Sequence, residues 1–198
     1  MTFEQMQAEF VRSRRGAISL PLTGVLNYSV AATVSLFVSQ ARANLVLVAC
    51  FWAIPPVAAL IGRIRGEIFG GDPGNPLFRL SKLARLMVLA TWAIHVPVWI
   101  EAPSLLPLTV GIAFALHWVV FGWSIGHSLG LVHLALRTIL VPLAWYAAPA
   151  NPVGAVSAAV ACCYAFSVVQ LSLVDWEALA ERALGGGTPP STVTGRAA

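Results

Sequence analysis

The chain has 198 residues, of which 58% are hydrophobic and 10% charged, with a mean hydropathy of +0.80 and a net charge of +4. A soluble domain carries about 25% charged residues, so this composition excludes a water-soluble globular fold and indicates a protein that lipid solvates. The apolar runs are too continuous for the alternating strands of a membrane barrel. The twelve Lys and Arg residues mostly flank these runs and form no nucleic-acid-binding face.

Residues 2–15 predict a short amphipathic helix. Thr2 and Gln5 have the spacing of a capping box, in which two side chains satisfy free backbone N–H groups at a helix start. Phe3, Met6 and Phe10 share one face of this helix, and three arginines end it. Two interpretations remain open: the helix lies on an anionic membrane surface, or it is a solvated lead-in to the first span.

Six apolar segments reach or approach the roughly 20 residues that cross a bilayer. They are residues 17–39, 44–62, 86–102, 104–123, 127–148 and 152–174. The short connections between them favour antiparallel helical hairpins. We expect one helical membrane domain over residues 1–184, with the last helix continuing to about Leu184 and a flexible tail at 185–198.

Three glycines, Gly122, Gly126 and Gly130, recur every fourth residue where the fourth span meets the fifth. In a membrane helix this spacing lets two backbones approach closely. The same glycines suit a tight turn. A single helix from Ser104 to Ala148 would be far too long for the bilayer, so we favour the turn.

The basic residues predict an orientation, because cytoplasmic loops of membrane proteins are rich in Lys and Arg. With the N-terminus in the cytoplasm, ten cationic residues lie inside and Arg42 alone lies outside, while Arg137 falls within the fifth span. The fold class is therefore all-α: a polytopic protein with six transmembrane helices and both termini inside. The ten inner residues are Arg12, Arg14, Arg15, Arg63, Arg65, Arg79, Lys82, Arg85, Arg182 and Arg196.

The loop over residues 63–85 combines basic residues with a turn-rich stretch from Gly71 to Pro76. It lacks the lysine and following hydroxyl residue of a phosphate-binding loop. A basic face of this kind predicts contact with anionic lipid headgroups.

Arg137 is the strongest anomaly, since it lies about eleven residues into the fifth span. An arginine at mid-bilayer costs on the order of 2.5–3.5 kcal/mol and by default faces the protein interior. The expected partner is Glu101, the only acidic residue on the outer side. The pair has two interpretations, an anion site or gate and a structural clamp between the third and fifth spans.

His133 lies one helical turn before Arg137, and His117 falls at a similar depth in the fourth span. With His95 and Asn27 they predict a polar cluster that could line a substrate or ion path. Three chemistries remain open: b-type haem bound by His117 and His133, proton relay, and hydrogen bonding between helices. No carboxylate or thiol joins these histidines at ligand spacing, so no metal site is expected.

Three short motifs resemble those of a family of small bacterial membrane proteins that is grouped as a domain of unknown function. They are the segment from Glu9–Phe10 to Arg15–Gly16, the Asn75–Pro76–Leu77 turn, and His117 in the fourth span. The resemblance extends through about the fifth span. It implies a multi-pass membrane architecture and carries no activity.

Together these patterns predict a multi-pass protein of the cytoplasmic (inner) membrane, either a small transporter or an accessory protein. No paired carboxylates, Ser-His-Asp order or HExxH motif is present, which favours a non-enzymatic role. Two alternatives remain. One is a haem-binding or enzymatic protein that uses His117 and His133. The other is a subunit of a membrane complex that packs Gly126, Gly130, Gly154 and Ala158 against another chain.

Overall fold

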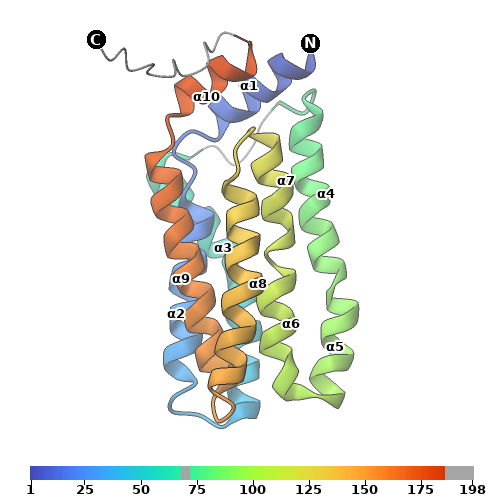
Figure 1. Cartoon of the computed structure of the whole chain (residues 1–198), viewed down its shortest axis with the longest axis vertical. Helices are drawn as coiled ribbons and strands as arrows, with labels where there is room; N and C mark the ends of the chain where they lie inside the picture. The colour runs from blue at the N-terminus through green and yellow to red at the C-terminus, as the bar shows by residue number, and fades with distance from the viewer. Residues whose placement is uncertain (68–71, 186–198) are drawn as a thin grey trace, which may run out of the picture.

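The computed structural model describes residues 1–67 and 72–185; the rest of the expected C-terminal tail lies outside the described residues. Within the described part every regular element is helical, and the helices stand side by side in an elongated bundle (Figure 1). We call each helix, or run of consecutive helices, that extends along the bundle a column. Three columns are single helices: α3 (Gln40–Arg65), α8 (Leu129–Ala147) and α9 (Pro152–Leu173), and the shorter α2 (Ser19–Val34) is a fourth. The other two are composite: α4 (Pro76–Ala90) continues as α5 (Trp92–Glu101), and η1 (Pro103–Leu105) continues as α6 (Leu106–Ala113) and α7 (Leu116–Ser124).

Five of these columns are long and apolar enough to cross a membrane. The exception is α2, whose 16 residues rise about 24 Å at 1.5 Å per residue. The predicted first span extended to residue 39, but the chain leaves the helix after Val34 and turns before α3 begins at Gln40. The predicted third span began at residue 86, whereas the helix begins ten residues earlier at Pro76.

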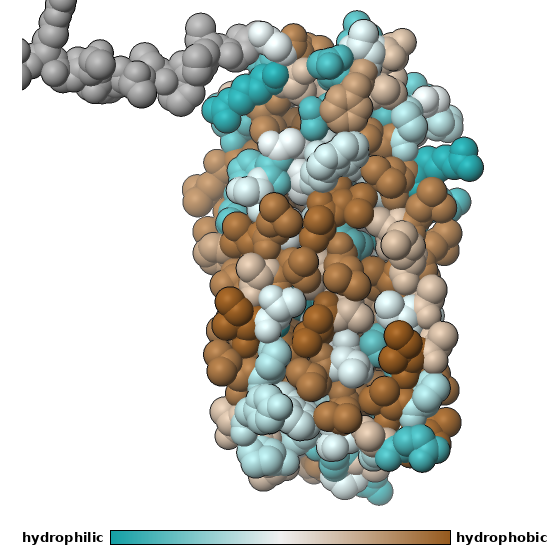
Figure 2. All heavy atoms as spheres, turned by 45° about the vertical axis from the view of Figure 1, so that its right-hand side comes forward, coloured by the Kyte–Doolittle hydropathy of each residue, from teal (hydrophilic) through white to brown (hydrophobic). Residues whose placement is uncertain are grey.

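Large apolar side chains cover the outside of the bundle, where a soluble protein would present charge. Leu36, Phe37, Met87 and Leu173 are each exposed over two thirds of their surface or more. On the face that Figure 2 shows, apolar residues dominate the middle of the bundle and hydrophilic residues gather toward both ends. This distribution is that of a protein whose middle is solvated by lipid.

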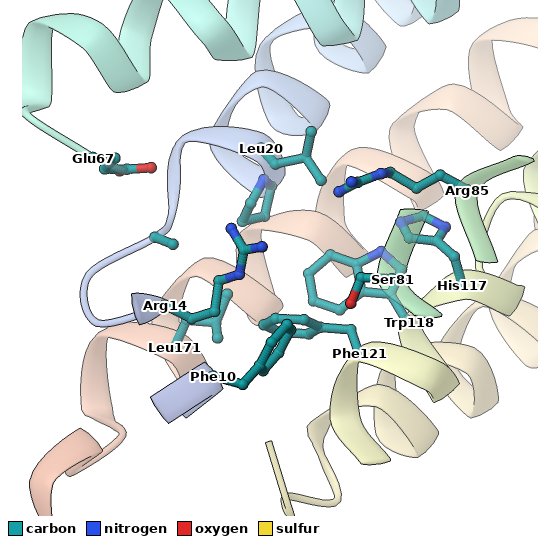
Figure 3. A pocket seen from close by; sticks show the side chains of 12 residues that line it. Phe10, Arg14, Leu20, Glu67, Ser81, Arg85, His117, Trp118, Phe121 and Leu171 are labelled. Atoms are coloured by element: carbon teal, nitrogen blue, oxygen red, sulfur yellow. The ribbon is translucent and has the colours of Figure 1, made fainter. Parts of the chain in front are cut away.

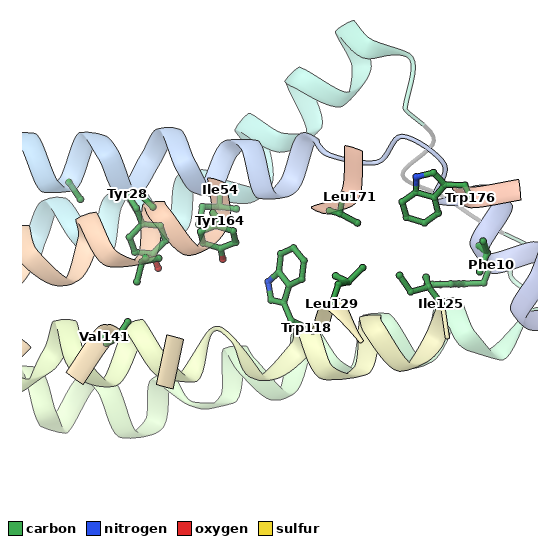
Figure 4. Packing of buried hydrophobic residues seen from close by; sticks show 14 of the residues in the cluster. Phe10, Tyr28, Ile54, Trp118, Ile125, Leu129, Val141, Tyr164, Leu171 and Trp176 are labelled. Atoms are coloured by element: carbon green, nitrogen blue, oxygen red, sulfur yellow. The ribbon is translucent and has the colours of Figure 1, made fainter. Parts of the chain in front are cut away.

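The most buried of the membrane-length helices is α9, which packs against α2 and α8. Small residues let its neighbours come close: a side chain at Gly24 of α2 would overlap the ring of Tyr164 on α9. Figure 4 shows Tyr28 and Tyr164 on one side of the core and Trp118, Leu129 and Val141 on the other. The polar residues of interest lie within this interior.

The turn between α7 and α8 settles the glycine-rich boundary. Gly126 lies in this turn with φ +67°, a backbone conformation that glycine adopts without strain. Gly122 and Gly130 flank the turn, and a Cβ at Gly122 would lie 2.8 Å from the backbone N of Gly130. The glycines therefore serve both expected purposes, a tight turn and a close approach of two helix backbones.

Two short helices, α1 (Phe3–Ser13) and α10 (Trp176–Ala183), lie across the same end of the bundle and pack on each other (Figure 1). At the start of α1, Thr2 and Gln5 form a reciprocal capping box. The prediction that the last span continues as a helix to Leu184 is wrong. The chain leaves the helix at Val174, and Asp175 caps a separate α10 by accepting a hydrogen bond from Ala178 N.

Candidate functional site in the membrane interior

Arg137 lies halfway along α8 and is completely buried. Its Nη1 is 3.5 Å from the Tyr164 hydroxyl, and its guanidinium lies 5.3 Å from the ring centre of Tyr164 and 6.0 Å from that of Tyr28. Two tyrosines from α9 and α2 thus surround the cation with aromatic faces, which attract positive charge. Within the described part of the chain, Nε and Nη2 of Arg137 have no hydrogen-bond partner.

The expected pair between Arg137 and Glu101 is not formed. Among residues 1–67 and 72–185 the ion pairs are Arg15–Glu177 and Arg65–Glu67, both at the end of the bundle that carries α1. Glu101 is exposed at the last residue of α5. The fifth-span arginine is therefore a buried cation whose nearest charge-stabilising groups are aromatic rings.

His133 lies one turn before Arg137 on the same helix face and is also fully buried. Its Nδ1 is 2.7 Å from the hydroxyl of Ser167 on α9. The indole of Trp118 stacks on the imidazole at 4.2 Å with an interplanar angle of 20°. Taking the described residues alone, the other ring nitrogen, Nε2, has no partner.

The ring stacked on His133 is therefore Trp118 of α7 and not His117. His117 precedes Trp118 and lines a separate cavity nearer α1. The two histidines that were candidates for haem ligation thus have different surroundings. One packs on an indole within the core, and the other borders an opening at the bundle end.

Asn27 and His95 do not join the cluster. Asn27 donates a hydrogen bond of 2.8 Å to the Cys50 carbonyl, which links α2 to α3. His95 is hydrogen-bonded at 3.0 Å to Thr91 and at 3.1 Å to Thr109, which links α5 to α6. These two residues make interhelical bonds, the structural alternative that the sequence left open.

The interior site therefore consists of His133 and Arg137 from α8, Tyr28 from α2, and Tyr164 and Ser167 from α9, with Trp118 as one wall. Sequence reasoning missed the tyrosines, the serine and the tryptophan as site residues. Tyrosine and serine occur in many apolar spans, and no pattern distinguishes those that face a cation. No group of three or more His, Cys, Asp or Glu side chains that could hold a metal occurs among the described residues.

A second polar arrangement lies outside the membrane interior, where the chain enters α2. Glu67 accepts hydrogen bonds from Ile18 N at 3.3 Å and Ser19 N at 3.2 Å, and it pairs with Arg65 at 2.8 Å. Burial by itself would raise the pKa of Glu67, but these hydrogen bonds outweigh it and hold the pKa below its usual value. A carboxylate at a helix N-terminus also complements the helix dipole.

The glycines that were predicted to pack against another chain make close contacts or a turn within this chain. Gly130 packs on the backbone of Trp118, and Gly154 packs on Ser35 and Asn151. Gly126 lies in the α7–α8 turn. Of the four residues in that proposal, Gly130 and Gly154 are buried, whereas Gly126 and Ala158 are exposed.

Comparison with known proteins relates the chain to a protein family. A family model described as a family of unknown function, DUF7010, matches residues 3–173. No curated protein and no solved structure matches the chain.

Proposed function

The chain belongs to this family of unknown function, and we propose that it is a six-span transporter-like protein of the cytoplasmic membrane that binds a small anionic solute at Arg137. The sixth crossing in this proposal is α2. Its 16 residues are short for a hydrocarbon layer of about 30 Å. The adjoining segments 17–18 and 35–39 supply the remaining length.

One observation supports the anion site more than any other: Arg137 is wholly buried, and none of the carboxylates that the structure describes pairs with it. A guanidinium does not lose its proton in a protein, so burial cannot neutralise it. Breaking a buried ion pair by removing one partner costs about 3–5 kcal/mol, and Arg137 resembles the cation that such a removal leaves behind. Contacts with Tyr28 and Tyr164 offset part of this cost, at about 2 kcal/mol for a desolvated cation–π contact.

Chemical complementarity supports a small anion as the missing partner. Nε and Nη2 of Arg137 form one edge of the planar guanidinium fork, and neither has a partner among the described residues. That edge fits a carboxylate or phosphate oxygen pair in a bidentate arrangement. His133 Nε2 and the Tyr28 hydroxyl are also unpartnered within that part of the chain and add further hydrogen-bonding capacity.

The test compares Arg137→Met with the wild type. Methionine matches much of the side-chain volume without the charge. In a buffer poor in small anions we expect the melting temperature of the purified variant to rise by several degrees, because the uncompensated charge is gone. Adding chloride, phosphate or small carboxylates should raise the melting temperature of the wild type and leave that of the variant unchanged.

Arg42→Gln is the control, since Arg42 is an exposed arginine at the start of α3 and should keep the full anion response. A loss of folded protein in Arg137→Met, together with a wild type that no anion stabilises, would show that Arg137 is a structural clamp. Proteoliposome uptake of the anions that stabilise the protein then tests transport. Binding without uptake would assign an accessory role.

A further inference from the structure

A cavity of about 110 Å³ opens at the end of the bundle that carries α1, away from the Arg137 site. Its walls come from the end of α1, the start of α2, and from α4, α7 and α9. Two arginines border it, Arg14 just after α1 and Arg85 on α4. In Figure 3 their guanidinium groups extend toward the cavity from opposite sides, above the rings of Phe10 and Phe121.

Neither arginine has a carboxylate partner among the described residues, where the ion pairs involve Arg15 and Arg65. Arg14 packs instead over the rings of Phe10 and Phe78, with 5.1 Å to each ring centre. The one carboxylate at the cavity, Glu67, is already held by Arg65 and by the N-terminus of α2. The cavity therefore keeps an excess of positive charge.

The two cations also repel each other. Burial, and to a smaller extent the charge of Arg85, lowers the pKa of Arg14 from its ordinary value. The guanidinium remains charged at neutral pH. An anion placed between the two groups would replace this repulsion with two attractions, and in surroundings of low dielectric constant such attractions are strong.

Three further polar atoms on the cavity walls lack partners within residues 1–67 and 72–185. They are the Ser81 hydroxyl, His117 Nδ1 and Trp118 Nε1. Buried polar groups are nearly always hydrogen-bonded in folded proteins, so several orphans around one cavity indicate an occupant. A single water needs only about 10–15 Å³ by the same measure of volume, so the cavity has room for a larger group.

The remaining walls are apolar: Leu20, Pro21, Phe121 and Leu171. A site with two cations, hydrogen-bonding groups and apolar walls at the end of a membrane bundle matches the boundary between lipid headgroups and acyl chains. A free inorganic anion would gain nothing from the apolar walls. A lipid would use both parts of the site.

We propose that this cavity binds the phosphate of an anionic phospholipid between Arg14 and Arg85, with the glycerol and upper acyl carbons against the apolar walls. The lipid would then join α1 to α4 and α2 at the membrane surface. The sequence predicted that the basic segment 63–85 contacts anionic headgroups, and this proposal assigns one such contact to a specific cavity. The two sites share Trp118, but Arg137 does not line the cavity, so the lipid site and the solute site can be tested separately.

The experiment uses the full chain, purified in detergent and stripped of lipid. Phosphatidylglycerol, phosphatidylcholine and inorganic phosphate are added separately, and the melting temperature and the bound lipid, counted by native mass spectrometry, are recorded. We expect one phosphatidylglycerol to bind and stabilise the protein, with at least tenfold weaker binding in Arg14→Gln and Arg85→Gln. Arg79→Gln is the matched control, an exposed arginine on the same helix as Arg85 that does not line the cavity.

Equal losses in Arg79→Gln and Arg85→Gln would overturn the proposal, because they would show general attraction to surface charge. Stabilisation by inorganic phosphate as strong as that by phosphatidylglycerol would identify a free-anion site instead. No response to either ligand would also overturn it. Arg137→Met should keep the lipid response, so failure of this proposal and failure of the solute site are distinguishable.

Discussion

At the scale of single residues, the side chain of Asn75 shows how one polar group can join distant parts of a membrane bundle. Asn75 is fully buried. Its amide donates hydrogen bonds of 2.8 Å to the Met6 carbonyl and 2.9 Å to the Glu9 carboxylate, while its oxygen accepts from Leu77 N and caps α4. The residue therefore links α1 to the start of α4 and caps the N-terminus of α4 at the same time.

Replacing Asn75 should expose both roles. Asn75→Ala loses the cap, worth about 0.5–2 kcal/mol, and the link to α1, so we expect a lower melting temperature. Asn75→Asp keeps the cap acceptor but places a carboxylate against Glu9, and at neutral pH it should be the worse of the two. Its deficit should shrink in acid, where one of the two carboxylates takes up a proton. Thermal unfolding at pH 7 and pH 5 measures both effects.

The double variant Glu9→Gln/Asn75→Asp provides the control. In this variant the amide at position 9 can donate a hydrogen bond to the carboxylate at position 75, the reverse of the wild-type contact. Stability at pH 7 should therefore recover relative to Asn75→Asp. If the single and double variants unfold at the same temperature, the contact between positions 9 and 75 contributes nothing to stability.

At the scale of helices, the pair α7–α8 depends on the absence of side chains at Gly122 and Gly130. A Cβ at Gly130 would overlap the Trp118 carbonyl, which belongs to backbone and cannot rotate away. The same close approach lets the Trp118 indole stack on His133. The close approach of the two backbones thus positions Trp118 as one wall of the interior site.

Gly130→Ala should therefore separate α7 from α8. Overpacking a tight contact costs about 1–3 kcal/mol, and we expect a lower melting temperature and a weaker response to anions at Arg137, since the Trp118–His133 wall shifts. Leu131→Ala is the neighbouring control, because Leu131 is 59% exposed on the lipid-facing surface. Size-exclusion profiles and melting curves of both variants give the comparison. Equal behaviour of the two would remove the packing explanation.

At the scale of the whole molecule, the cationic residues that were predicted to be cytoplasmic gather at one end of the bundle. Helices α1 and α10 and the start of α4 lie at one end (Figure 1). The described cationic residues assigned to the cytoplasm belong to these helices, to the residues just after α1 and to the last turn of α3. The loop that begins α3 lies at the other end with Arg42 nearby. An even number of crossings follows if all six columns span the bilayer.

Single cysteines in a background without Cys50, Cys162 and Cys163 test this topology. Asp72→Cys and Glu177→Cys should react with an impermeant maleimide only in inverted vesicles, because we place both on the cytoplasmic side. Ser39→Cys, between α2 and α3, should react only in right-side-out vesicles. Labelling of Ser39→Cys and Asp72→Cys from the same side would show that α3 does not cross the membrane. Opposite labelling of Asp72→Cys and Glu177→Cys would rule out an even number of crossings after α3.

The sequence alone determined the helical class, the capping box at Thr2 and the turn at Gly126, and five of its six predicted spans correspond to helices of membrane length. These features depend on hydrophobic length, local side-chain spacing and backbone freedom, which a one-dimensional pattern records. It also singled out Arg137, since a charge within an apolar span is visible without any fold.

Only the tertiary structure decided what surrounds that charge. Glu101 was the expected partner because it is the one acidic residue predicted outside, yet the helices bring Tyr28 and Tyr164 to Arg137 instead. The same packing directed Asn27 and His95 into interhelical bonds, gave His117 and His133 different surroundings, and brought Arg14 and Arg85 to one cavity. Each of these outcomes depends on how helices rotate and pair, and that is determined by the shapes of side chains far apart in the sequence.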